Sequence, residues 1–322
     1  MDALSEILKS LRTQYCAVGT MLLRSPWGLC VEDFASPSAL SLVEGDPFWV
    51  RMRGMPALRV GPGDTVLFPR GANYRIASSP DGACDEWGPA WLANGLPDFN
   101  QGEEPSAPVR FSWGAGSGPE TRLLGLAFGL ALGNRNPLLA ALPDLIVLRA
   151  GRGHAFSWVA PSIEFLASEG SAGLPGYAAT ARLLADLIFV SALRSHMLDE
   201  PLGTKGWIRG LSDPCIARAL SVIHATPGVD WSVGSLAERA ALSRTTFATR
   251  FASLVGESPI EYLTNLRMHL ATQRIVRDRP NLTQLAFELG YTSDAAFRDA
   301  FKRRYGMPPS RYAADRESAE AQ

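Results

Sequence analysis

The chain has 322 residues, a length that allows two domains, each with its own buried core. Its apolar fraction is 46%, its charged fraction 20% and its net charge −1, values typical of an ordinary globular protein. No run approaches the ~18 uncharged apolar residues of a membrane span, so a helical membrane protein is excluded and no membrane partner is expected.

The first half of the chain has the pattern of a β domain. Residues 1–13 predict a short helix and contain no signal-peptide core, so we expect a cytoplasmic protein. From Gly19 to about Val159, short apolar runs are separated by Gly and Pro: MLL, ALSLV, FWVRM, ALRV, TVLF, LLGLAF and LIVL. Such runs predict an antiparallel β-sandwich or barrel over residues 1–160. Residues 80–108 are predicted to form a long surface loop.

One motif of this half ends in an informative substitution. Residues 63–74, GDTVLFPRGANY, resemble the second motif of the cupin barrel, G-x5-P-x-G-x2-H, with Tyr74 where the metal-binding histidine would stand. The first histidine of the whole chain is His154. Because cupin enzymes hold their metals mainly through imidazoles, we expect no metal, no other cofactor and no catalytic residue.

The cysteines and tryptophans of this half each leave two interpretations open. The cysteines show no CxxC or paired spacing, so buried thiols are expected, with redox sensing by Cys16 and Cys84 as the alternative. Five tryptophans line either an apolar effector pocket or the barrel core: Trp27, Trp49, Trp87, Trp91 and Trp113.

A helical segment, residues 161–211, follows the β domain. Within it, Leu183, Leu187, Val190 and Leu193 recur at helical spacing and form an apolar stripe. The stripe is either part of the domain core or the seam of a homodimer. The stretch EPLGTKGWIRGLSDP, rich in Gly and Pro, is the candidate linker to the next domain.

Residues 212–313 contain a unit of about thirty residues that occurs twice. The first copy runs from Leu236 to Tyr262 and the second from Leu285 to Tyr312, with one extra residue in the second turn. Five residues recur fifty positions later: Phe247, Phe251, Gly256, Pro259 and Tyr262. Each copy predicts a helix-turn-helix, over residues 232–254 and 282–305; two structural helical hairpins are the alternative.

A long helix joins the two copies. Ser258, Pro259 and Glu261 form a capping signal from which the helix is predicted to run to about Val276. At ~1.5 Å per residue it is nearly 30 Å long, which would hold two recognition helices roughly one DNA turn apart. Residues 314–322 are predicted to be a disordered tail.

In the first copy, Phe247, Phe251 and Leu254 recur at i, i+4 and i+7 and are predicted to face the core. The opposite face is then expected to contact DNA through these side chains: Arg244, Thr245, Ala248, Thr249 and Arg250. Small methyl and hydroxyl groups let a helix lie deep in the major groove, and the arginines at its rim suit phosphates or a guanine.

In the second copy, Phe297, Phe301 and Tyr305 take the inward positions. The outward side chains, also predicted to contact DNA, are Ala295, Arg298, Asp299, Lys302 and Arg303. Arg298 is the best candidate for a bidentate contact to guanine. Asp299 would repel phosphates, so its pairing with Arg303 at i, i+4 is the alternative to a cytosine contact.

The distribution of charge agrees with this division of the chain into two halves. Residues 209–322 hold 15 Lys and Arg against 12 Asp and Glu, and residues 1–208 hold 16 against 20. A mildly basic half joined to an acidic half favours one nucleic-acid-binding domain and one domain with a different task.

These features identify a resemblance. Residues from about Ser212 to Tyr312 are similar to the DNA-binding domain of AraC-type (AraC/XylS) transcription regulators, and the second copy is the more diagnostic. The matching positions in that copy include Leu285-Ala286, Gly290-Tyr291, Phe297, Phe301-Lys302-Arg303, Pro308-Pro309 and Arg311-Tyr312. The N-terminal half is similar to the sensor half of the cupin-containing members.

The resemblance implies an α+β chain with a cupin-like barrel, further helices and an all-α DNA-binding domain. It implies a non-enzymatic regulator, usually an activator, with double-stranded promoter DNA, RNA polymerase and a small effector or oxidant as partners. Two other functions remain open. A cupin-type enzyme with an accessory DNA-binding domain is disfavoured by the absence of histidine before His154, and an architectural DNA binder would have an inert N-terminal half.

Overall fold

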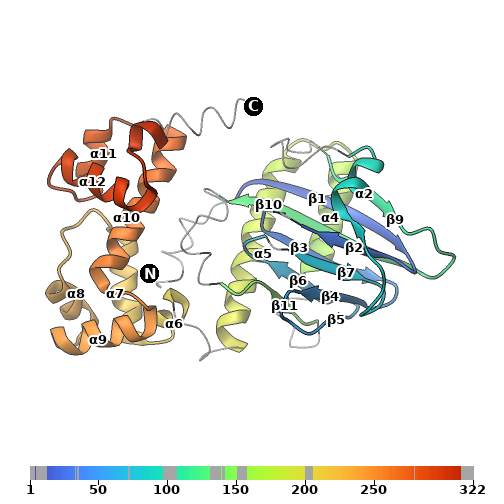
Figure 1. Cartoon of the computed structure of the whole chain (residues 1–322), viewed down its shortest axis with the longest axis horizontal. Helices are drawn as coiled ribbons and strands as arrows, with labels where there is room; N and C mark the ends of the chain where they lie inside the picture. The colour runs from blue at the N-terminus through green and yellow to red at the C-terminus, as the bar shows by residue number, and fades with distance from the viewer. Residues whose placement is uncertain are drawn as a thin grey trace. The chain divides into compact units, whose positions relative to one another are not determined.

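The structure, a computed structural model, describes residues 13–32, 34, 36–71, 73–96, 107–130, 142–150, 158–199, 206–278 and 280–312, with residues 4 and 139. The chain divides into two compact units (Figure 1). The N-terminal unit comprises residues 13–134 and 142–196, and the C-terminal unit is built mainly from residues 197–322. The predicted helix over residues 1–13 and the tail over 314–322 lie almost wholly outside the described residues.

The N-terminal unit contains two β-sheets. The strands are β1 (Thr13–Arg24), β2 (Gly28–Val31), β3 (Ser38–Glu44), β4 (Phe48–Met52), β5 (Leu58–Val60), β6 (Thr65–Phe68), β7 (Tyr74–Ala77), β8 (Asp85–Glu86), β9 (Val109–Trp113), β10 (Glu120–Leu130) and β11 (Ile146–Leu148). One sheet has the order β11-β6-β3-β10-β1-β9 and the other β5-β4-β7-β2-β8. All seven apolar runs of the sequence lie wholly or largely in strands.

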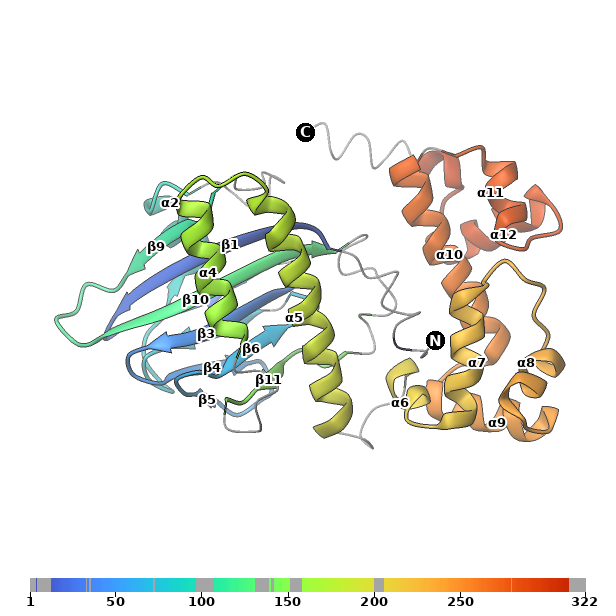
Figure 2. The same cartoon turned by 180° about the vertical axis from the view of Figure 1, so that it is seen from behind.

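Helices α4 (Val159–Ser171) and α5 (Tyr177–Asp199) lie across the outer face of the six-stranded sheet (Figures 1 and 2). Phe128 of β10 meets Phe189 of α5 edge to face, with ring centroids 5.9 Å apart. The inner faces of the two sheets share one apolar core. Because the six-stranded sheet is covered on both faces, its central strands are apolar almost throughout.

The α+β class and the helical C-terminal region are confirmed, whereas a closed barrel is not. The described strands form two open sheets, with β9 and β11 at the edges of one and β5 and β8 at the edges of the other. The strand pairs are also not all antiparallel, because β1 pairs with β9, and β2 with β8, in parallel. Parallel neighbours require a long crossover, so a local strand pattern cannot reveal them.

The expected loop over residues 80–108 contains regular structure. Helix α2 (Trp87–Ala93) follows β8 directly and buries Ala90 and Trp91. Gly88 and Pro89 predict a break, but Pro89 lies in the first turn, where proline removes no helical hydrogen bond. Residues 97–106 of this stretch lie outside the described residues.

The expectation of unpaired thiols is wrong for two of the three N-terminal cysteines. Cys30 and Cys84 form a disulfide, with Cα atoms 5.7 Å apart. The two residues come together because β2 and β8 are neighbours, with Cys30 opposite Glu86. Cys16 is buried in β1 and Cys215 is half-buried. The pairing follows from sheet topology and has no signature in the spacing of the cysteines.

The C-terminal unit is helical. Its helices are α6 (Trp207–Leu211), α7 (Pro214–Ala225), α8 (Val233–Ala240), α9 (Arg244–Val255), α10 (Pro259–Asp278), α11 (Leu282–Glu288) and α12 (Asp294–Tyr305). Asp213 caps α7, because its Oδ1 accepts hydrogen bonds from the backbone N–H groups of Cys215 and Ile216. In the described parts of the chain, no helix is long and apolar enough to cross a membrane.

Candidate nucleic-acid interface

The first helix-turn-helix is formed by α8 and α9. Ser232 and Ser235 form a capping box at the start of α8, and Ser243 caps α9 by accepting a hydrogen bond from the Thr246 N–H. Between the helices, Ala241 has φ 55°. This left-handed conformation makes the tight turn that sets the angle between the two helices.

The second helix-turn-helix repeats this design in α11 and α12. Asn281 and Ser293 cap the two helices, and Gly290 takes the left-handed position with φ 77°. Gly256 and Gly306 end α9 and α12 in the same left-handed conformation. The capping residues and glycines therefore explain where each recognition helix begins and ends.

Each recognition helix has a buried aromatic face and an exposed polar face. Phe247 and Phe251 of α9 are fully buried, as are Phe297 and Phe301 of α12. On α9, Leu254 is only half-buried and Val255 takes the deeper position. The predicted DNA-contacting side chains are exposed on both helices, apart from the half-buried Ala248: Arg244, Thr245, Ala248, Thr249, Arg250, Ala295, Arg298, Asp299, Lys302 and Arg303.

Two of the predicted arginines already form ion pairs within the protein. Arg250 binds Asp213 Oδ2, at 2.6 Å from Nε, so it also holds α9 against the start of α7. Arg298 Nε donates to Asp294 Oδ2 at 2.7 Å. The two residues lie one helical turn apart, and their ion pair orients the Arg298 guanidinium on the exposed face of α12. Asp294, not Asp299, is thus the carboxylate paired with an arginine on this helix.

The two helix-turn-helix units are joined by more than the predicted rod. Arg267, in the middle of α10, donates through Nε to the carbonyl of Pro227 at 2.8 Å and through Nη2 to that of Val229 at 2.9 Å. Its Nη1 reaches the Gly290 carbonyl at 3.4 Å, and its guanidinium lies 5.7 Å from the centre of the Tyr291 ring. One side chain therefore binds the segment before α8 and the turn of the second unit.

Close backbone contact accompanies these hydrogen bonds. A Cβ added at Gly228 would lie 2.2 Å from the Glu288 carbonyl oxygen, and one added at Gly290 would lie 2.4 Å from the Gly228 carbonyl oxygen. The two segments thus touch at positions where only glycine fits. Sequence reasoning did not single out Arg267 or Gly228, because nothing in a lone arginine on a mixed helix indicates three carbonyl partners.

Helix α6 connects directly to the first recognition helix. The N–H of Gly206, which precedes α6, donates to the Leu254 carbonyl at 3.0 Å. A Cβ added at Gly210 would lie 3.0 Å from the Val255 side chain. The predicted linker therefore ends in a helix packed against α9.

The described part of the N-terminal unit offers an apolar pocket rather than a set of metal ligands. Among the described residues, no cluster of three His, Cys, Asp or Glu side chains could hold a metal ion. Tyr74, at the position of the cupin histidine, lines an apolar pocket instead, together with Trp87 and Trp91. Trp27 packs against Phe48 in the core, so each of the two interpretations holds for some of the tryptophans.

Comparison with known proteins gives two matching family models. A cupin model matches residues 2–198, and a helix-turn-helix domain model matches residues 236–315. An AraC-like transcription regulator of Streptomyces lividans is 30% identical over 317 residues, which cover 97% of this chain and 98% of the relative.

Other similar proteins cover parts of the chain. The transcriptional regulator AlkR of Acinetobacter baylyi is 38% identical over 184 residues, 55% of this chain and 58% of AlkR. The crystal structure of the DNA-binding domain of AdpA in complex with a target DNA has 31% sequence identity. It covers 34% of this chain and 98% of that chain, with a TM-score of 0.31.

Proposed function

Because this chain belongs to the AraC family of DNA-binding transcription regulators and carries a cupin domain, we propose that α9 and α12 enter two successive major grooves of a promoter. The observation that carries the proposal is the pair of exposed recognition faces on one scaffold, joined by α10 and Arg267. A scaffold tied at two places preserves the spacing that simultaneous insertion requires.

The ten predicted side chains divide by chemistry into two roles. The small groups of Thr245, Ala248, Thr249 and Ala295 contact base edges and thymine methyls, and Arg298 binds a guanine. Arg244, Lys302 and Arg303 bind phosphates, which fix the position of the protein on the duplex. Arg250 does so only by sharing its charge with Asp213, and Asp299 sits beside a cytosine amino group or balances the cations of α12.

Control is assigned to the N-terminal unit. We propose that it senses a small effector or oxidant, that bound protein activates transcription with RNA polymerase, and that two chains dimerise through α5. Leu183 and Leu187 support the last point, because they are 70% and 51% exposed on the outer side of this helix. The same proposal places the protein in the cytoplasm and gives it a regulatory, non-enzymatic role.

Selection from a pool of random duplexes tests DNA binding directly. We expect the full chain to enrich two short half-sites about one helical turn apart, over bulk competitor at moderate ionic strength. Sedimentation of the protein on the enriched duplex counts the chains bound and tests the dimer. A pool that stays unenriched, with and without cell extract as a source of effector, would refute the proposed promoter recognition.

Oxidant sensing is assigned to Cys84, with Cys30 as its disulfide partner, and to the buried Cys16. Hypochlorite would oxidise the two thiols to a disulfide while it is itself reduced to chloride. We expect reduced wild-type protein to change its affinity for the enriched duplex on titration with hypochlorite, and Cys84→Ser to lose this response. Cys16→Ser tests the second cysteine, and Cys215→Ser is the control. A full response in both Cys84→Ser and Cys16→Ser contradicts the proposal.

A further inference from the structure

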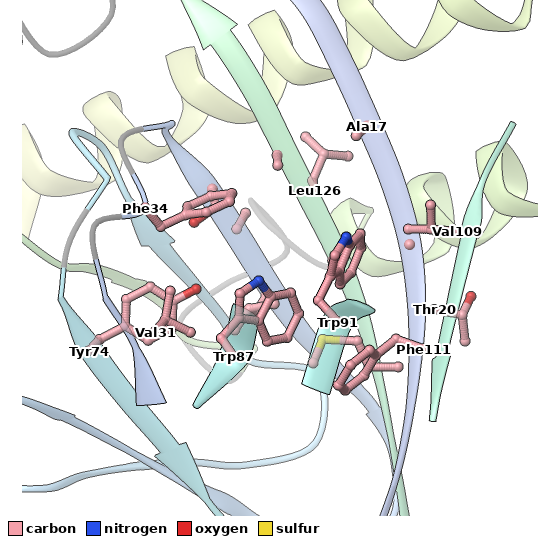
Figure 3. Close-up of a pocket in the computed structure, with 17 residues that line it drawn as sticks. Ala17, Thr20, Val31, Phe34, Tyr74, Trp87, Trp91, Val109, Phe111 and Leu126 are labelled. Carbon is pink, nitrogen blue, oxygen red and sulfur yellow. The ribbon is translucent and has the colours of Figure 1, made fainter. Parts of the chain in front are cut away.

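One pocket of the N-terminal unit lies inside the sandwich, between its two sheets. It is lined by β1, β3, β9 and β10 of the six-stranded sheet, by Val31 and Tyr74 of the other sheet, and by Trp87 and Trp91 of α2 (Figure 3). All of these elements belong to one compact unit. The pocket is therefore a feature of this unit alone.

The floor of the pocket arises from small residues that face each other across strands. Ala17 of β1 lies opposite Ala127 of β10, and Gly19 lies opposite Gly125. Two residues further along, the pair is Met21 and Leu123, which fill the core. Since alternate residues of a strand point to the same face, two rows without large side chains leave a hollow beside a filled core.

An aromatic wall stands across from this floor. The rings of Trp87 and Trp91 lie 5.0 Å apart, and the Phe111 ring is 5.0 Å from Trp87 and 5.9 Å from Trp91. Figure 3 shows these three rings and Phe34 around the cavity. Flat aromatic faces opposite methyl groups and glycines suit a flat or slender apolar molecule.

Polar groups are few, and none of the described lining residues is charged. The hydroxyl-bearing side chains are those of Thr20, Ser38 and Tyr74. Burial raises the pKa of Tyr74 to about 12, and the nearby Ser38 hydroxyl partly opposes the rise, so Tyr74 is protonated at neutral pH. Ser38 is 5% exposed, yet its Oγ has no hydrogen-bond partner of good geometry among the described residues. Its interaction with the Tyr74 hydroxyl lacks the geometry of a full hydrogen bond, and a buried hydroxyl in this state is costly unless a ligand or water completes its bonding.

The size of the space limits the ligand further. Its volume is about 60 Å³. One water requires roughly 10–15 Å³ on this measure, so the pocket holds about five groups of that size. A single ring or a short alkyl chain meets this limit.

We propose that this pocket binds a small uncharged molecule, a single ring or short chain with at most one hydroxyl or carbonyl group, placed against Ser38. The proposal rests on the sensor role of the N-terminal unit and specifies its ligand class. A carboxylate is excluded, because no cation in the described lining would compensate the loss of its hydration.

Three related probes test the class: toluene, benzyl alcohol and benzoate. Tryptophan emission of the full chain, excited where the probes do not absorb, reports binding beside Trp87 and Trp91. We expect toluene and benzyl alcohol to change the emission saturably, and benzoate at neutral pH to bind at least tenfold more weakly. Equal binding of benzoate and benzyl alcohol, or no binding of either neutral probe, overturns the proposal.

Variants locate the site. Ala127→Leu fills the hollow and should abolish the emission change, whereas Ala172→Leu, the same change at an exposed position just after α4, should not. Ser38→Ala should weaken benzyl alcohol about 3- to 10-fold and leave toluene unchanged, as expected for one neutral hydrogen bond. This second variant keeps the test valid if Ala127→Leu fails to fold. Neutral-probe binding unaltered in both lining variants contradicts this location.

Measuring affinity for the enriched duplex separates the two proposals. If the neutral probes bind but leave DNA affinity unchanged, the pocket assignment stands and control through it fails. If benzoate alone binds and alters DNA affinity, control stands and the ligand class is wrong.

Discussion

At the scale of single residues, the two helix-turn-helix units differ at one backbone position. Gly290 takes a left-handed conformation without cost, while its counterpart Ala241 takes the same conformation with a Cβ atom. An L-residue in this region loses ~1–2 kcal/mol, and glycine in place of alanine costs about 0.5–1 kcal/mol in chain entropy. The first turn is therefore strained relative to the second.

Ala241→Gly should consequently stabilise the C-terminal unit by about 0.5–1 kcal/mol. Urea unfolding, followed through the helical signal, measures the change. Ala252→Gly serves as the matched control, because Ala252 is exposed within α9 and its replacement should destabilise by about 1 kcal/mol. A loss of stability in Ala241→Gly would show that the turn is not strained.

Arg298 and Arg303 lie close together on α12 but are assigned different roles. Arg298→Ala should cost about 1–3 kcal/mol on the selected duplex and relax the preference at one base pair. Arg303→Ala should instead weaken selected and random duplexes alike and lower the salt slope by about one. Fluorescence anisotropy at several salt concentrations distinguishes them; equal losses on both duplexes for Arg298→Ala would exclude base reading there.

At the scale of elements, the arrangement of the two recognition helices depends on how α10 is attached. Helix α10 alone would allow each unit to rotate about the end of the helix to which it is attached. Arg267, in the middle of α10, is hydrogen-bonded both to the segment before α8 and to the turn of the second unit. Arg274, on the same helix, pairs with Glu288 of α11, which belongs to the second unit. The two arginines provide a matched comparison of tethers between units and within one unit.

Arg267→Met should lower affinity for the two-groove duplex about tenfold or more, because three carbonyl partners are lost and the units are no longer fixed together. The diagnostic readout is spacing: inserting two base pairs between the half-sites should penalise the wild type more than Arg267→Met. Arg274→Met should keep the wild-type dependence on spacing, since surface ion pairs contribute little. An unchanged spacing penalty in Arg267→Met would assign it a role in stability alone.

At the scale of the whole molecule, local patterns predicted the elements better than their partners. Phe247, Phe251 and their repeats indicated the inward faces, and α10 begins at Pro259, where Ser258 and Pro259 form the predicted capping signal. The Cys30–Cys84 bond and the parallel pairs were missed because they depend on contacts between distant segments. The pocket was suggested by its tryptophans, but its floor required the register that places Gly19 opposite Gly125.

Stability of the whole chain should depend on pH through buried histidines of the C-terminal unit. Burial lowers the pKa of His269 to about 4, and burial together with His269 lowers that of His224 to about 3. Below about pH 6.5 the unfolded chain binds protons that the folded unit does not, so stability falls until the folded pKa is reached. Above pH 6.5 these two histidines do not contribute to the dependence of stability on pH.

Thermal melting at pH 7 and pH 5.5 tests this expectation. The wild type should melt at a lower temperature at pH 5.5, and His269 alone contributes up to about 1.4 kcal/mol per pH unit. His269→Gln removes one titrating group and should reduce the difference. An equal drop in wild type and variant would assign the pH dependence to other groups.

The hydrogen bond from Gly206 to Leu254, the packing of Gly210 on Val255 and the Arg250–Asp213 pair share a mechanical consequence. The polypeptide that leaves the N-terminal unit is anchored first on α9, the helix proposed to read one half-site. A conformational change transmitted along the chain from the N-terminal unit would therefore reach α9 before α12. Induction through this path would change the contacts of α9 with its half-site, while the contacts of α12 with the other half-site would persist.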